Sequence, residues 1–134
     1  MLKMNINADK VAAEQLLLVD DDPDFRDALD KQLRYAGYRV ALAADGGEAL
    51  VWLRKNHADV LILDIVMPHK EGLETMLALR RSHPQLPVIA ISGGGRIEAR
   101  DYLKIAASLG AAGVLSKPFP LADLQALIEA ARRV

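Results

Sequence analysis

The chain has 134 residues, 51% hydrophobic and 26% charged, a size and composition that suit one compact domain with a substantial core. Its formal net charge of −1 argues against a nucleic-acid-binding surface, which needs clustered Lys and Arg in excess. The lack of cysteine excludes disulfides, thiol catalysis and cysteine-ligated metals. No apolar run is long enough to cross a membrane and the first residues do not form a signal peptide, so we expect a cytoplasmic protein.

The alternation of apolar runs and helical patterns predicts the fold. Buried strands are expected at Leu16–Val19, Tyr38–Ala43, Val60–Leu63, Pro87–Ile91 and Gly113–Ser116. Apolar residues at helical spacing predict helices over Phe25–Ala36, Gly46–Asn56, Leu73–Ser82, Tyr102–Leu109 and Leu121–Ala131. Strand and helix alternate five times, with connections too long for hairpins. We therefore predict a doubly wound α/β domain with a parallel sheet over residues 15–134, after an N-terminal extension over residues 1–14.

Three acidic residues follow the first predicted strand. Asp22 precedes Pro23, which fits a helix N-cap followed by proline at the first helical position, so Asp22 is assigned a structural role. Asp20 and Asp21 are not explained in this way. Two adjacent like charges at a strand end repel each other unless a positive group binds them, and these two residues are therefore candidates for a metal site.

Polar residues also end the third, fourth and fifth predicted strands, as Asp64, Ser92 and Lys117. The carboxyl ends of parallel strands meet at one edge of a sheet, so we expect these side chains to share a crevice with Asp20 and Asp21. Three carboxylates favour a hard divalent cation such as Mg²⁺, and a lysine and a hydroxyl beside them suit a phosphoryl group. Asp64 would be the nucleophile, although an Asp at a strand end also commonly caps a turn.

These residues lie in motifs that resemble a known family. In chain order, V-D-D-D-P, L-I-L-D-I-V-M-P-H-K-E-G, I-A-I-S-G and V-L-S-K-P-F closely resemble the receiver domain of two-component response regulators. The resemblance extends from about Gln15 to the end of the chain. It implies a flavodoxin-like, or CheY-like, fold in which five strands have the order 2-1-3-4-5 and five helices cover the sheet.

The resemblance also implies how the site works. Asp64 would accept a phosphoryl group from a histidine kinase or a histidine phosphotransfer protein. Asp20 and Asp21 would form the acidic pocket for Mg²⁺, with Asp21 favoured as the direct ligand, and the backbone carbonyl of Val66 would complete the protein's share of the coordination. The chain would be a switch and not an enzyme, with at most weak self-catalysed phosphorylation and dephosphorylation.

The resemblance gives two further residues a role. Ser92 would hydrogen-bond the phosphoryl group and Lys117 would pair with it. The Lys117–Pro118 bond resembles the cis peptide of the family, and an X-Pro bond is the place where a cis peptide is plausible. Glu71 replaces the Asp that is more usual before Gly72, a change that we expect a surface position to tolerate.

Two other departures concern the switch. Val114 occupies the place where many receivers have Tyr or Phe, whose ring rotates inward on phosphorylation, and Val cannot make that motion. The glycine-rich segment Ser92–Arg96 is longer than usual. We therefore expect the signal to be read out through ordering of Gly93–Arg96 and the start of the fourth helix.

Other functions are less well supported by the residues. The glycine run fits neither common nucleotide-phosphate loop, because Glu98 takes the place of the last glycine. A metal-dependent phosphatase would need a substrate pocket and a general acid, which the sequence does not offer plainly. A pseudo-receiver that binds partners without phosphorylation is disfavoured by the presence of all five pocket residues.

The downstream step stays open between three alternatives. We favour a module that binds an unknown partner protein through the fourth helix, fifth strand and fifth helix, without direct contact with nucleic acid or membrane. A phosphorelay intermediate that passes the phosphate on, and the receiver of a longer DNA-binding regulator, are the other two. A homodimer is compatible with each of them.

Overall fold

A computed structural model of the chain describes residues 14–65, 71–93 and 97–132. The strands are β1 (Gln15–Val19), β2 (Arg39–Ala43), β3 (Val60–Asp64), β4 (Val88–Gly93) and β5 (Gly113–Lys117). The helices are α2 (Pro23–Tyr35), α3 (Gly46–Leu53), α4 (Glu71–Ser82), α5 (Ile97–Ser108) and α6 (Leu121–Arg132). All strand pairs are parallel and the order is β2-β1-β3-β4-β5, which confirms the predicted flavodoxin-like topology.

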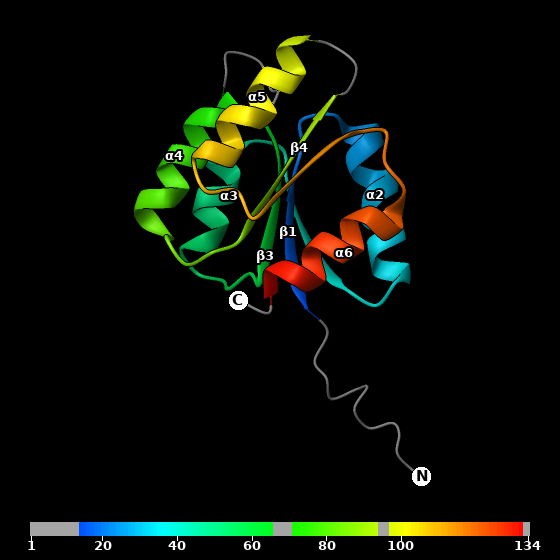
Figure 1. Cartoon of the computed structure of the whole chain (residues 1–134). Helices are drawn as coiled ribbons and strands as arrows, with labels where there is room; N and C mark the ends of the chain where they lie inside the picture. Colours follow the sequence, from blue (N-terminus) through cyan, green and yellow to red (C-terminus); the bar gives the residue numbers. More distant parts are fainter. Residues whose placement is uncertain (1–13, 66–70, 94–96, 133–134) are drawn as a thin grey trace.

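The sheet is the middle of three layers. Helices α3, α4 and α5 cover one face, and α2 and α6 cover the other (Figure 1). Successive residues of β1 divide between the two faces: Leu17 and Val19 belong to the core under the three helices, and Leu16 and Leu18 to the core under the two. Both faces of the central strands are therefore buried, which is why these strands read as continuous apolar runs.

The residues predicted to start and stop the first helix do so in the structure. Asp22 caps α2, since its side chain accepts hydrogen bonds from the backbone N–H groups of Asp24 and Phe25, and Pro23 occupies the first turn. Gly37 follows the helix with a φ of +106°, a conformation that costs other L-residues energy. These two ends fix where α2 leaves the carboxyl edge of β1, directly after Asp20 and Asp21.

Two helix boundaries differ from the predicted ones by three residues or more. Helix α3 ends at Leu53 and not at Asn56, because the N–H groups of Arg54 and Lys55 bond to carbonyls three residues back and tighten the chain into a turn. Helix α5 begins at Ile97, five residues before the predicted Tyr102. Of the predicted extension over residues 1–14, the structure describes Glu14 alone.

Candidate functional site: an acidic pocket with a lysine

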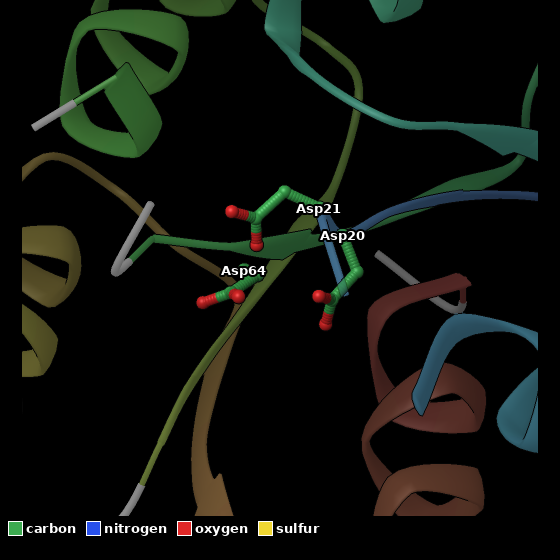
Figure 2. Close-up of side chains that lie close together, drawn as sticks. All are labelled: Asp20, Asp21 and Asp64. Atoms are coloured by element: carbon green, nitrogen blue, oxygen red, sulfur yellow. The ribbon is translucent and has the colours of Figure 1, made fainter. Parts of the chain in front are cut away.

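The structure brings three predicted carboxylates together at the carboxyl edge of the sheet. Asp20 and Asp21 follow β1, Asp64 ends the neighbouring β3, and an oxygen from each lies within 4.8 Å of the others (Figure 2). Asp20 and Asp64 are buried, whereas Asp21 is exposed. The arrangement concentrates negative charge on two adjacent strands, with Asp21 at its open side.

Lys117 comes to this group from the far edge strand β5. Its Nζ lies 2.9 Å from Oδ2 of Asp20 and 3.6 Å from Oδ2 of Asp64. Residues 20 and 117 are 97 positions apart, so it is the tertiary fold that brings them into contact. A fully buried carboxylate such as Asp20 requires a charged or hydrogen-bonding partner, and Lys117 supplies it.

Ser92 and Val66 complete the set of predicted residues. Ser92 lies on β4 opposite Ser116 of β5, is fully buried, and donates a long hydrogen bond of 3.4 Å to the carbonyl of Gly93. A contact of that length is weak, so the hydroxyl can turn to a better acceptor at little cost. Val66 lies outside the described residues, as do Gly94–Arg96 of the expected readout segment. The Lys117–Pro118 peptide is cis, as predicted.

Two residues in the first turn of α2 also belong to the site, and sequence reasoning missed them. The guanidinium of Arg26 donates to the backbone carbonyl of Asp20 over 2.8 Å. The Phe25 ring lies beneath Lys117, with Nζ 3.9 Å from its centroid. The only sequence signal for these two residues was their position in the first turn of a helix that starts directly after the acidic pair, which brings that turn close to the pocket.

The donor set fits Mg²⁺. The ion prefers oxygen ligands at about 2.1 Å in an octahedron, so two ligand oxygens lie at most about 4.2 Å apart. The three carboxylates need only small side-chain movements to close from 4.8 Å to that spacing. Together with Lys117 they carry a formal charge of minus two, which a divalent cation would balance.

Comparison with known families agrees with the fold. The family profile described as "Response regulator receiver domain" matches residues 16–129. The chain belongs to this family. Receiver domains of this kind are the signal-accepting part of two-component systems. None of the helices that the structure describes is long and apolar enough to cross a membrane.

Curated relatives of this receiver domain include mycobacterial regulators. The chain is 37% identical over 123 residues to the transcriptional regulatory protein PrrA of Mycobacterium bovis, covering 92% of this chain and 52% of that protein. It is 37% identical over 119 residues to the response regulator MprA of Mycobacterium leprae, covering 89% of this chain and 51% of that protein. This receiver domain therefore spans about half the length of these relatives.

Solved structures also resemble the receiver domain over almost their whole length. The receiver domain of NtrX from Brucella abortus shares 31% identity with a TM-score of 0.80, covering 89% of this chain and 98% of that one. The response regulator TrrA of Thermotoga maritima, solved with Mg²⁺ and beryllofluoride, shares 27% identity with a TM-score of 0.76, covering 88% and 98%.

Proposed function

We propose that this receiver domain accepts a phosphoryl group on Asp64 and thereby switches a surface that a partner protein reads. The observation that carries the proposal is the placement of the buried Asp64 carboxylate beside those of Asp20 and Asp21, with the ammonium of Lys117 3.6 Å from its Oδ2. A carboxylate oxygen there can attack the phosphorus of a phosphohistidine. The new P–O bond forms as the P–N bond breaks, and the imidazole leaves and takes up a proton.

The other residues stabilise the charge that the transferred group brings. Lys117 can pair with a phosphoryl oxygen while staying close to its present position, because it already contacts both Asp20 and Asp64. The hydroxyl of Ser92 can exchange its weak contact with Gly93 for a phosphoryl oxygen. Bound to Asp20, Asp21 and Asp64, with the carbonyl of Val66 as a further ligand, Mg²⁺ would neutralise charge on the phosphoryl oxygens.

The readout surface in this proposal consists of α5, β5 and α6. Among the residues of these elements whose exposure the structure describes, the large apolar side chains of Ile105 on α5 and Val114 on β5 are exposed, at 44% and 37%. Strand β5 carries both Val114 and Lys117, so the pairing of Lys117 with a phosphoryl group acts on the same strand as the surface. Because Val114 has no ring to rotate, the segment from Gly93 to the start of α5 transmits the change in this proposal.

We assign the remaining features on the same basis. The phosphoryl donor is a histidine kinase or a histidine phosphotransfer protein, and the domain acts in the cytoplasm. It turns over no separate substrate and has at most weak self-catalysed phosphorylation and dephosphorylation. Its readout is a protein contact, either with an unknown partner or within a homodimer.

A second candidate is control of transcription within a longer regulator. It is favoured by the similarity to PrrA, a transcriptional regulatory protein of which this chain spans about half. In that case the same switch surface would contact a DNA-binding domain. A relay role differs from both, because the phosphoryl group would pass from Asp64 to a histidine of a phosphotransfer protein, and incubation with such a protein would empty Asp64.

Intact-mass spectrometry after incubation with acetyl phosphate tests the proposal. We expect one phosphoryl adduct that requires Mg²⁺, is stable in acid and labile in base, and does not form in Asp64→Asn. A chain without an adduct, with acetyl phosphate consumed no faster than in buffer, would contradict the proposal and favour a pseudo-receiver. Fast release of phosphate from acetyl phosphate without an adduct would favour a hydrolase or a very short-lived phospho-form.

A further inference from the structure

The first turn of α2 contacts both charged partners of the pocket. Arg26 donates to the backbone carbonyl of Asp20, while the Phe25 ring faces the ammonium of Lys117 at 3.9 Å. Phe25 is half-buried and packs on the core cluster between the sheet and α2 and α6. One helical turn therefore contacts both residues of the same salt bridge, Asp20 through its backbone carbonyl and Lys117 through its ammonium.

The ring of Phe25 is itself held in place by the segment that carries the lysine. Phe119 lies two residues after Lys117, and its ring meets that of Phe25 edge-on, at 6.2 Å between centroids and 76° between planes. This is a favourable geometry for two aromatic rings. Phe25 therefore contacts the end of β5 at two points, once through the ammonium of Lys117 and once through Phe119.

We propose that Phe25 is a positioning residue, whose ring face holds the Lys117 ammonium beside Asp64 while the charges of the pocket change. The inference rests on the proposed function. The lysine stem is flexible, and its other contacts here are with the carboxylates of Asp20 and Asp64. Both carboxylates lose strength as partners when a cation or a phosphoryl group engages them. The attraction of a neutral aromatic ring for the ammonium does not depend on those events.

Loss of the contact between Phe25 and Lys117 should lower the rate of phosphoryl uptake. Phe25→Leu keeps an apolar side chain in the core but removes the ring face. We expect its rate constant for phosphorylation by phosphoramidate with Mg²⁺ to fall about ten-fold, within the range of a partly buried cation–π contact. Phe25→Tyr keeps the ring face, so its rate constant should stay within about two-fold of the wild-type value.

A matched control separates this role from general loss of packing. Tyr38→Leu removes another partly buried aromatic ring from the same core cluster. Tyr38 precedes β2 at the opposite edge of the sheet, where its neighbours are Gln125, Glu129, Glu14 and Arg132. We expect Tyr38→Leu to lower the melting temperature as much as Phe25→Leu does or more, and to leave the rate of phosphoryl uptake unchanged.

The contact itself has a spectroscopic signature that does not require phosphorylation. In protein labelled with ¹³C at the lysine ε carbon, and assigned through Lys117→Arg, the ring current of Phe25 should move the Hε resonance of Lys117 upfield. The upfield shift should persist in Phe25→Tyr and in Tyr38→Leu and vanish in Phe25→Leu.

Three results would overturn the proposal in distinguishable ways. If the upfield shift is missing from the wild-type chain or persists in Phe25→Leu, the ring does not hold the lysine. If the shift vanishes in Phe25→Leu but the rate constant stays at the wild-type value, the contact has no positioning role. If the wild-type chain shows the shift but takes up no phosphoryl group, the proposed function is wrong and the role of Phe25 falls with it.

Discussion

The two edges of the sheet handle charge in opposite ways. At the amino edge, charges meet in small sets at the surface: Arg132 bonds Glu14 and Glu129, and Asp59 accepts the N–H of Gln15 and faces His57. At the carboxyl edge, three carboxylates lie together, one ammonium contacts two of them, and one of those two, Asp20, has no exposed surface. Both edges are rich in polar residues, so composition alone does not distinguish them.

The difference separates charges that complete the fold from charges that prepare for a ligand. A matched pair at the surface contributes little and needs nothing more. A buried excess of like charge destabilises the folded state, and such a cluster is typical of sites where a bound cation or a transferred group offsets the repulsion. The carboxyl edge is therefore the place to look for chemistry in this chain, and the amino edge supplies controls.

The largest expected effect comes from neutralising one acid at each edge. Asp64→Asn should abolish phosphoryl uptake, because an amide cannot form the acyl phosphate, and should raise the melting temperature, because it removes a buried charge from among like charges. Asp59→Asn should do the reverse: full uptake with a lower melting temperature, since the carboxylate accepts the N–H of Gln15 at 2.7 Å. Mass spectrometry measures phosphoryl uptake and thermal unfolding measures the melting temperature. The same changes in both variants would contradict the distinction between the two edges.

Removing one cation at each edge should come next. Lys117→Met leaves the fully buried Asp20 without its ammonium, so we expect the free energy of unfolding to fall by about 3 kcal/mol. Adding Asp20→Asn should recover most of that loss. Arg132→Met removes a surface partner of Glu14 and should change stability little. Urea unfolding measures all three, and equal losses at the two edges would contradict the distinction.

Substituting one glycine at each edge should give a smaller difference in stability, and the cause of the loss differs between the two sites. A Cβ on Gly72, at the start of α4, would lie 2.3 Å from the backbone Cα of Ile65, just after β3. Gly72→Ala should therefore cost about 2 kcal/mol or more and slow phosphoryl uptake. A Cβ on Gly37 meets nothing within 4 Å, so Gly37→Ala should cost about 1 kcal/mol through its positive φ alone.

Substitution with Asn distinguishes these two causes. Asn tolerates a positive φ better than Ala does, so Gly37→Asn should recover part of the loss, whereas Gly72→Asn should be worse than Gly72→Ala. Chemical unfolding gives the ranking, and rescue by Asn at position 72 would show that the predicted contact with Ile65 is not the cause.

The smallest expected effect is on the pH dependence of stability, through Tyr38 at the amino edge. Burial, and after it the charge of Glu129, raises the pKa of the Tyr38 hydroxyl above its ordinary value of 10.0. The folded state therefore binds this proton more tightly than the unfolded state, so the contribution to stability is complete below pH 10 and is lost as pH rises through the folded-state pKa. Tyr38→Phe should lose less stability than the wild-type chain between pH 9 and 11, as measured by unfolding at each pH.

The fold could be predicted from local pattern because local and tertiary signals agree here. The runs before Asp20 and Asp64 are apolar on both faces, and Asp22, Pro23 and Gly37 mark the ends of one helix by mechanisms that act within a few residues. The predicted end of α3 was wrong by three residues, because the tight turn at Arg54 does not change the spacing of the apolar residues.

Only the site residues that lie at the ends of strands could be predicted from the sequence. Topology sends Asp20, Asp64 and Lys117 to one edge, so a sequence argument finds them. Phe25 was assigned to the core stripe of its helix, because its contact with Lys117 depends on a distance between α2 and β5 that no local pattern encodes. The roles of Ser92 and Val66 stay predictions.

The decisive measurement is the chemical identity of the modified residue. After reaction with phosphoramidate and Mg²⁺, borohydride reduces an acyl phosphate of aspartate to homoserine, which peptide mass mapping locates. We predict homoserine at position 64 alone, only when donor and Mg²⁺ are both present. Homoserine at Asp20 or Asp21, or no conversion in a chain that carries a phosphoryl adduct, would contradict the assignment of Asp64 as the phosphoryl acceptor.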